Sequence, residues 1–298
     1  MRFLITGGTG FIGSHLARRL AGDGHRVTTY DDLSNSTKEA AASLEAAGIR
    51  FIRGDITDRG PLVRACAGAD VVVHLAAQIS VQKSMEDPAG TERVNVGGSE
   101  NVASACSEAG AAAVAASSAA VYGDACGDGS TITERTRCVP LSPYGTSKLG
   151  TERALGDYGV MLRFFNVYGP GQSPEYAGVI SRFAAAIRDG SDLVINGDGE
   201  QTRDFVAVDD VVGAVGAASG SAAGGGRGTY NIGTGTAISV NELARMMIKR
   251  GGGRTRRGPA LEGDIRHTRH DTSLAREELG FSAAIRLEDG LGRYWGTF

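Results

Sequence analysis

The sequence predicts an α/β protein built on a doubly wound parallel sheet, with a smaller α/β domain for binding a substrate. The first 14 residues form a short apolar strand that runs directly into glycines at positions 7, 10 and 13 and then into a helical pattern. Further apolar runs with little alternation recur between helical stretches, as expected for parallel strands covered by helices on both faces. This combination is typical of a Rossmann-type fold that binds a dinucleotide.

The three glycines have separate roles in such a turn. Gly7 permits the tight turn, Gly10 lets the backbone approach a pyrophosphate, and Gly13 lets the helix pack closely on the strand. The helix repeats its apolar residues at positions 12, 16 and 20, and its N-terminus offers free N–H groups to phosphates. A glycine cluster alone is usually just a turn, but here the strand, the helix and a downstream acid agree.

The downstream acid is Asp31, which follows the second apolar run at 26–30. A carboxylate at this place reaches the ribose hydroxyls of NAD and repels the additional phosphate of NADP. We therefore expect NAD as the cofactor. The alternative is a solvated loop aspartate beside Asp32.

Later apolar runs and helical stretches alternate along the chain. Two prolines, Pro88 and Pro143, stand where a helix can begin. Strands are predicted at 49–53, 70–75, 112–116 and 160–165, and helices at 37–47, 59–67, 89–109 and 143–158.

The character of the sequence changes beyond about residue 167, where loops rich in glycine and proline precede a helix at 179–188 and a strand at 193–196. We expect residues 1–166 to form the NAD-binding domain and residues 167–298 mainly the substrate-binding domain. Apolar runs at 205–208 and 229–232 are expected to return to the first sheet, which assigns 205–233 to the first domain. Glycine-rich stretches at 220–228 and 251–253 are predicted as exposed turns.

Length and charge narrow the function classes. The 298 residues can bury one large or two modest cores, and the net charge of −3 with dispersed signs does not favour a nucleic-acid or membrane surface. No segment has the length and apolarity of a membrane span, and a strand begins at residue 2. We therefore expect no signal peptide and a cytoplasmic protein.

Cysteine and histidine spacing predicts neither a metal site nor a disulfide framework. No C-x-x-C pair occurs among the four cysteines, which are Cys66, Cys106, Cys126 and Cys138. His267 and His270 lie close to Asp264 and Asp271, but this spacing matches no metal motif. We expect no metal, and reduced cysteines that lie mostly in the core.

A catalytic group is predicted where a strand end meets the start of a helix. Tyr144 and Lys148 are four residues apart and share one helix face, while Ser117 and Ser118 end the preceding strand. A lysine cation and a positive nicotinamide ring would stabilise the phenolate and lower the pKa of the tyrosine, which makes it a general base for an alcohol. A Tyr-x-x-x-Lys pair alone is common on helix surfaces, so the combination with the serine and the glycines carries the prediction.

Together these motifs resemble the extended short-chain dehydrogenase/reductase family, and within it the UDP-hexose 4-epimerases. The resemblance covers essentially the whole chain. The stretches that carry it lie at 7–15, 31–34, 54–56, 74–78, 95–96, 117–123, 144–148, 162–170 and 197–205.

The resemblance implies roles for particular residues. Ser118, Tyr144 and Lys148 would be catalytic, and Lys148 would also hold the nicotinamide ribose. The implied cofactor-binding residues are Gly7, Gly10, Phe11, Ile12, Gly13, Asp31, Asp32, Asn35, Asp55, Ile56, Leu75, Ala76, Ala77, Gln78, Asn95, Tyr144 and Lys148. The implied substrate-binding residues are Ser118, Asn166, Val179, Asn196, Arg203, Arg266 and Thr268.

The implied activity is epimerisation of a nucleotide sugar at carbon 4 through a transient 4-keto sugar. An NDP-sugar 4,6-dehydratase is the alternative enzyme, but related dehydratases carry an acidic residue where this chain has Ala119 and Ala120. A non-enzymatic, NAD-sensing regulatory protein is a further alternative. It would be expected to have lost Ser118, Tyr144 or Lys148, and all three are present.

Several positions depart from the family pattern. Leu261 stands where the family often has a diphosphate-binding arginine, so Arg203 alone, or with Arg266, would hold the diphosphate. Asn196 replaces an aromatic residue beside the uracil, and a small Thr268 is expected to admit N-acetylated sugars. The family's dimer pairs the helix after Lys148 with its counterpart, so we expect a homodimer, although this helical stretch is short.

Overall fold

The larger part of the molecule is a seven-stranded sheet with strand order β11-β6-β5-β4-β1-β2-β3, in which all neighbouring strands are parallel. The computed structural model describes residues 1–125, 130–172, 178–260, 266 and 269–297. The strands of the sheet are β1 (Arg2–Thr6), β2 (Arg26–Asp31), β3 (Arg50–Arg53), β4 (Val71–His74), β5 (Ala112–Ser118), β6 (Gly159–Phe164) and β11 (Gly228–Ile232).

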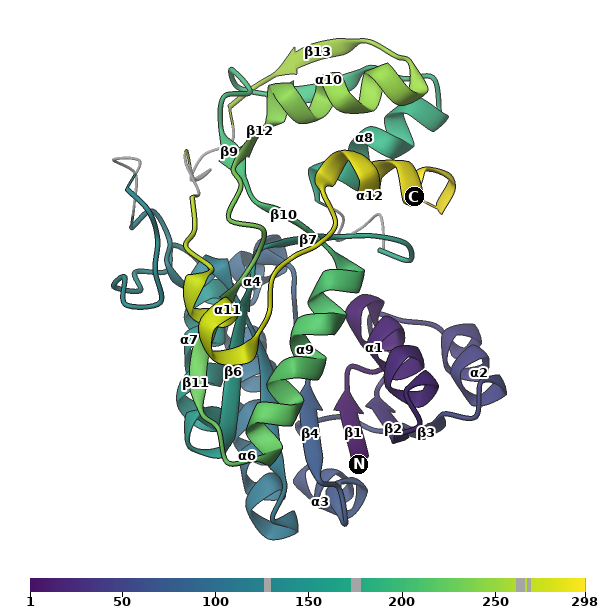
Figure 1. Ribbon diagram of the computed structural model, residues 1–298, viewed down its shortest axis with the longest axis vertical. Helices are drawn as coiled ribbons and strands as arrows, with labels where there is room; N and C mark the ends of the chain where they lie inside the picture. The colour runs from purple at the N-terminus through teal and green to yellow at the C-terminus, as the bar shows by residue number, and fades with distance from the viewer. Residues whose placement is uncertain (126–129, 173–177, 261–265, 267–268, 298) are drawn as a thin grey trace.

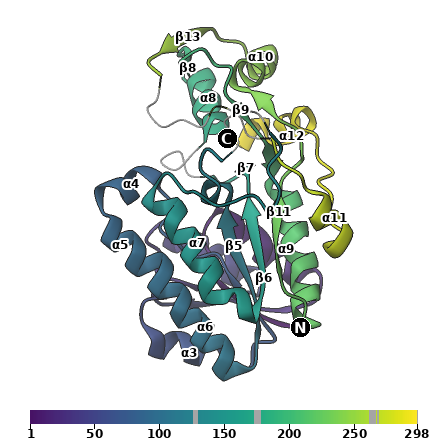
Figure 2. The same cartoon turned by 90° about the vertical axis from the view of Figure 1, so that its left-hand side faces the viewer.

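Helices connect these strands and cover both faces of the sheet. They are α1 (Phe11–Gly22), α2 (Lys38–Ala46), α3 (Arg59–Cys66), α4 (Val81–Glu86), α5 (Pro88–Glu92), α6 (Gly98–Ala109), α7 (Pro143–Leu155) and α9 (Val208–Ala223), with the short turns η1 (Arg93–Gly97), η2 (Ala119–Val121) and η3 (Gly156–Tyr158). Successive strand residues face opposite layers: Phe3 and Ile5 belong to the core under α1 and α9, whereas Leu4 belongs to the core under α3 and α6. Figures 1 and 2 show these two helical layers on either side of the sheet.

The strand order reverses between β1 and β4. The chain passes from β1 outward to β2 and β3, and then crosses back to β4 and continues to β5, β6 and β11. In open parallel sheets a ligand binds in the crevice at the carboxyl ends of the strands, where this reversal occurs. The fold therefore places a binding site above the ends of β1 and β4.

A smaller region lies at the carboxyl edge of the sheet, at the top of Figure 1. It has its own apolar core, to which Phe183, Leu193 and Leu243 belong. Its elements are α8 (Val179–Arg188), β8 (Leu193–Asn196), α10 (Val240–Gly251), β13 (Thr255–Gly258), α12 (Leu287–Arg293) and η5 (Trp295–Thr297). Two pairs of short strands lead into it, β7 (Asn166–Tyr168) with β10 (Phe205–Ala207) and β9 (Thr202–Arg203) with β12 (Ile238–Ser239). Helix α11 (Ser273–Leu279) returns to pack against β11 and α9.

The predicted return of the chain to the first sheet is only half correct. The segment predicted at 229–232 forms β11, which pairs with β6 as expected. The segment predicted at 205–208 instead pairs with β7 in a separate two-stranded sheet. Only one residue separates its partner β7 from the end of β6, so the pair lies beyond the carboxyl end of β6, outside the large sheet.

One helix prediction and one turn prediction also need correction. The helix predicted at 89–109 starts at Pro88 but is interrupted by the π-helical turn Arg93–Gly97. The exposed turn predicted at 220–228 is shorter, because α9 continues to Ala223. The other predicted helices and strands agree with the structure to within a few residues at their ends.

The three cysteines in the described ranges form no disulfide. Cys66 and Cys106 are buried and free, Cys138 is partly buried and free, and Cys126 lies outside the described residues. Over the described ranges, every helix is too short or too polar to cross a bilayer.

Candidate active site

A cavity of about 660 Å³ lies at the point where the strand order reverses. It is lined by the glycine-rich turn, by the residues after β2, β3 and β4, and by the ends of β5 and β6. Every predicted cofactor-binding residue except Asn95 borders this cavity, as do Ser118 and Asn166. The fold therefore gathers residues that are up to about 160 positions apart in the sequence.

The glycine-rich turn leaves no room for side chains. Gly7 has a φ of 68°, and a Cβ on it would come within 2.6 Å of the backbone nitrogen of Ala76. A Cβ on Gly13 would lie 2.2 Å from the carbonyl oxygen of Gly7. Helix α1 begins after Gly10 with no side-chain cap, so its first N–H groups are available to an anion. The turn fits the pyrophosphate of a dinucleotide.

Asp31 is held in place by backbone donors at the end of β2. Its Oδ2 accepts a hydrogen bond from the N–H of Thr9 at 3.1 Å, and its Oδ1 accepts one from the N–H of Leu33 at 2.9 Å. Leu33 has a φ of 67°, a left-handed conformation that is strained for a branched residue. Ser34 in turn donates its N–H to Asp32. The carboxylate thus ties the acidic turn to the glycine-rich turn and keeps further lone pairs for a ribose.

Asn95 is not among the residues that line the cavity, and its contact with the cofactor stays a prediction. It is buried in η1, where its Oδ1 accepts from the N–H of Gln78 at 2.7 Å and its Nδ2 donates to the carbonyl oxygen of Gln78 at 2.9 Å. The same Nδ2 donates to the hydroxyl of Ser147 on α7 at 2.8 Å. Asn95 therefore fixes the backbone of Gln78, which lines the cavity, against the catalytic helix.

Ser118, Tyr144 and Lys148 come together at the cavity wall. Helix α7 starts with Pro143 after the N-cap Ser142, which places Tyr144 in its first turn beside the end of β5. The Tyr144 phenol lies beside the Ser118 hydroxyl, which favours the ionised form of the phenol. Lys148, one turn further along, is buried and donates from Nζ to the carbonyl oxygen of Ala116 at 2.9 Å.

The electrostatics differ from the sequence prediction. Burial raises the pKa of Tyr144 above its ordinary value, and the neighbouring Ser118 hydroxyl opposes this rise. Burial also lowers the pKa of Lys148 to about 8, while the charge of Glu152 opposes that lowering. In the protein alone, desolvation therefore outweighs the expected effect of Lys148 on the phenol. Burial lowers the pKa of His74 to about 3, and the charge of Lys148 contributes to this lowering.

Among the predicted substrate-binding residues, only Ser118 and Asn166 are seen to line the cavity in the described part of the chain. Asn166 borders the cavity, and its Nδ2 donates to the carbonyl oxygen of Asp204 at 3.1 Å. Val179 starts α8 and packs against the smaller region's core, and only the preceding Gly178 lines the cavity. Thr268 and Leu261 lie outside the described residues, so the structure gives no account of them.

Asn196, Arg203 and Arg266 also lie away from the cavity wall. Asn196 ends β8, and its carbonyl oxygen accepts from Gln201 at 3.0 Å. Arg203 donates from Nη1 to the carbonyl oxygen of the preceding residue at 2.7 Å. Arg266 forms an exposed ion pair with Asp198 at 2.6 Å instead of facing the cavity. The predicted help of Arg266 at a diphosphate would require this ion pair to open.

Some cavity residues were missed by the sequence analysis. Phe164 ends β6 and Phe165 follows it, so both line the cavity at the same end of the sheet as Ser118. Their place at the carboxyl end of a predicted strand could have identified them, since the carboxyl ends of parallel strands meet at one end of the sheet. Lys83 of α4 also lines the cavity, and no motif in the sequence marked it.

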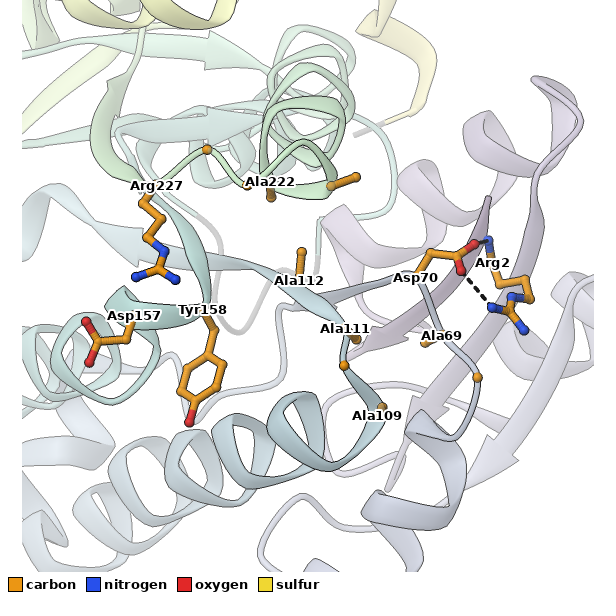
Figure 3. A pocket seen from close by; sticks show the side chains of 15 residues that line it. Arg2, Ala69, Asp70, Ala109, Ala111, Ala112, Asp157, Tyr158, Ala222 and Arg227 are labelled. Atoms are coloured by element: carbon orange, nitrogen blue, oxygen red, sulfur yellow. Dashed lines mark hydrogen bonds and ion pairs between the residues drawn. The ribbon is translucent and has the colours of Figure 1, made fainter.

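A second cavity, of about 510 Å³, lies at the opposite edge of the sheet (Figure 3). Arg2 and Asp70 form an exposed ion pair at 2.7 Å on one side, and Arg227, Asp157 and Tyr158 lie on the other. Its remaining wall consists of alanines and glycines, and none of the predicted site residues border it. Within the described ranges, no group of three or more metal-ligating side chains was found at either cavity.

Known proteins are similar to this chain over almost its whole length. Residues 3–233 match the profile of the NAD dependent epimerase/dehydratase family. UDP-glucose 4-epimerase of Mycolicibacterium smegmatis is 38% identical over 98% of this chain and 97% of its own length. dTDP-glucose 4,6-dehydratase of Streptomyces griseus is 35% identical over 97% and 91%. The solved structure of MoeE5 in complex with UDP-glucose and NAD has a TM-score of 0.87 at 37% identity and covers 99% of this chain and 98% of that one.

Proposed function

The chain belongs to the NAD dependent epimerase/dehydratase family, and from this premise we propose that it is a UDP-hexose 4-epimerase that interconverts UDP-glucose and UDP-galactose. The observation that carries the proposal is the contact of Ser118 with Tyr144 beside buried Lys148, on a cavity whose neighbouring positions 119 and 120 are alanines. The reaction is an isomerisation with no net oxidation.

NAD is the cofactor of the family, and the residues present fit it. The Gly7, Gly10 and Gly13 turn would hold the pyrophosphate, Asp31 and Asp32 the adenosine ribose, and Asp55 and Ile56 would flank the adenine. Tyr144 and Lys148 border the same cavity and would contact the nicotinamide ribose. When bound, NAD supplies reversible oxidation at carbon 4 of the sugar.

Tyr144 is the proposed general base and acid for the sugar's 4-hydroxyl. Its phenolate takes the hydroxyl proton as the 4-keto sugar forms, and the resulting phenol returns the proton after the ketone has rotated to present its other face. The Ser118 hydroxyl lies beside the phenol, so we propose that it donates a hydrogen bond to the oxygen on carbon 4. The protonated ammonium of Lys148 favours the phenolate electrostatically.

The nucleotide must be held firmly and the hexose loosely, because the 4-keto sugar must rotate within the site to present its other face. We propose that Asn166 at the cavity wall and Arg203 of β9 contact the sugar nucleotide and its diphosphate, with Val179 and Asn196 nearer the base and Arg266 as a further cation. The small Thr268 is proposed to admit N-acetylated hexoses.

Dehydration is less well supported than epimerisation, even though a dehydratase is among the relatives. Loss of water requires a proton to be taken from carbon 5 and another to be given to the leaving hydroxyl. Ala119 and Ala120 form the turn η2 directly after Ser118, and neither side chain can move a proton.

The test is product analysis with the purified protein. We expect UDP-glucose to yield UDP-galactose of unchanged mass, with UDP-N-acetylglucosamine epimerised as well. A product lighter by one water from UDP-glucose or dTDP-glucose would replace this proposal with the dehydratase. No turnover of any hexose nucleotide by NAD-loaded protein would contradict both enzymes.

We also propose a homodimer through α7, as the resemblance implies. Helix α7 lies in the outer layer together with α5 and α6 (Figure 2). Light scattering on the purified protein should give twice the 30.8 kDa chain mass. A single-chain mass at micromolar concentration would contradict it.

A further inference from the structure

Glu152 lies on the same face of α7 as the catalytic residues. Tyr144, Lys148 and Glu152 are spaced four residues apart, which stacks them on one side of the helix. Their partners are three consecutive residues at the end of β5. Ser118 contacts Tyr144, Ala116 accepts from Lys148, and the hydroxyl of Ser117 donates to Glu152 Oε1. The strand end is thus fastened to the helix at three successive points.

The carboxylate of Glu152 is buried and held by a second partner. Arg163 of β6 donates from Nε to Oε1 at 2.8 Å and from Nη2 to Oε2 at 2.7 Å, and the two side chains are only 7% and 9% exposed. Such a two-pronged pair fixes the orientation of both groups. Together with Ser117, it satisfies the carboxylate from two different strands.

Arg163 is in turn held in place by Tyr122. Its Nη1 donates to the hydroxyl of Tyr122 at 2.8 Å, and its guanidinium lies over the Tyr122 ring at 4.7 Å from the centroid. Tyr122 donates to Oδ1 of Asn231 on β11 at 2.6 Å. A fully bonded buried network of this kind holds one arrangement of its members.

We propose that Glu152, clamped by Arg163 and Ser117, is a positioning residue that sets the face of α7 carrying Tyr144 and Lys148 against the end of β5. Its catalytic meaning rests on the proposed function, because it is through Lys148 and Tyr144 that Glu152 would affect turnover.

The charges around Lys148 are consistent with this role. Tyr144 and Glu152 face it from its own helix, His74 from β4, and Arg163 from β6 through its pair with Glu152. Burial keeps His74 neutral, with a pKa of about 3, and lowers the pKa of Lys148 to about 8. Among these groups Glu152 is the one whose charge raises the pKa of Lys148.

The test reads Lys148 directly by NMR of protein labelled with ¹³C and ¹⁵N in lysine. The chain has only four lysines, so the signals are few, and Lys148 is assigned by its absence in K148R. We expect the titration midpoint of Lys148 in NAD-loaded E152Q to lie below that of the wild type. E152D keeps the charge on a shorter side chain and should fall between the two. The other three lysines should not move.

E108Q is the matched control. Glu108 pairs with Arg59 at 2.6 Å on the surface, so E108Q also removes one carboxylate from an arginine pair but should leave the Lys148 midpoint unchanged. An unchanged midpoint in folded E152Q would overturn the proposal. Loss of folding in both E152Q and E152D would overturn it as well, because the pair would then determine folding and not the position of the lysine.

Kinetics separate this inference from the proposed function. If UDP-glucose is epimerised, E152Q should lower kcat by roughly tenfold with little change in KM, since the effect acts on proton transfer and not on nucleotide binding. Wild-type protein without epimerase activity, but with the NMR shift in E152Q, would reject the proposed function alone. Normal epimerisation with no shift would reject the role of Glu152 alone.

Discussion

The two sides of the cavity are built in different ways. The cofactor side consists mainly of backbone turns at the strand ends, where steric limits at Gly7 and Gly13 and the bonds of Asp31 fix the shape. The proposed substrate side would depend on long side chains from the smaller region, which do not line the cavity, and Arg266 there is paired with Asp198. Backbone shape therefore prepares the cofactor side in advance, whereas the proposed substrate side would require side chains to change partners.

The largest expected effect on turnover comes from removing the Tyr144 hydroxyl, which transfers a proton where cofactor and substrate meet. Y144F should lower kcat by about 10²–10⁴-fold, because no other group at the cavity end of α7 can take the hydroxyl proton. NAD content measured after denaturation should equal that of the wild type. Turnover near the wild-type rate in Y144F would remove Tyr144 from its role.

A second prediction tests the preformed cofactor side. G13A should abolish NAD retention and destabilise the fold by about 1–3 kcal/mol, because the new Cβ would meet the Gly7 carbonyl oxygen. G22A on the same helix is the matched control, since a Cβ there meets nothing within 4 Å. It should retain NAD. Equal NAD content in G13A and G22A would contradict the steric account.

The pH dependence of stability tests the burial of Lys148. Its pKa is about 8 in the folded protein and its ordinary value is 10.5, so between these values the unfolded chain binds a proton that the folded chain does not. The free energy of unfolding should therefore rise with pH across this window, by on the order of 3 kcal/mol relative to K148M. Denaturant titrations at pH 8 and pH 10.5 measure the difference, with exposed Lys249→Met as the control. A constant difference between wild type and K148M would show that Lys148 is not desolvated.

The smallest effects are expected on the substrate side. R203A should raise KM for UDP-glucose by roughly tenfold or more, as for loss of a charged hydrogen bond. R266A should raise it less than about fivefold, because the arginine begins in an exposed ion pair of small net energy. Neither change should alter NAD content. A larger effect of R266A than of R203A would mean that Arg266 leaves Asp198 and holds the diphosphate.

Local sequence patterns predicted the parts that depend on neighbours in the chain. The glycine-rich turn and the acid after β2 were found from spacing, and all of those residues border the cavity. The π-helical turn that contains Asn95 has no signature in the apolar pattern. The pairing of Arg266 with Asp198 joins residues 68 positions apart, which spacing does not show. The extent of desolvation around Tyr144 and Lys148 likewise depends on packing from several strands.

The central claim is that Tyr144 transfers the proton of the sugar's 4-hydroxyl beside the nicotinamide. A crystal structure of the protein with NAD and UDP-glucose tests it most directly. We predict the Tyr144 oxygen within hydrogen-bond distance of the oxygen on carbon 4, with Ser118 on the same oxygen and the nicotinamide ring facing carbon 4. A Tyr144 oxygen that points away from both sugar and nicotinamide would contradict the account.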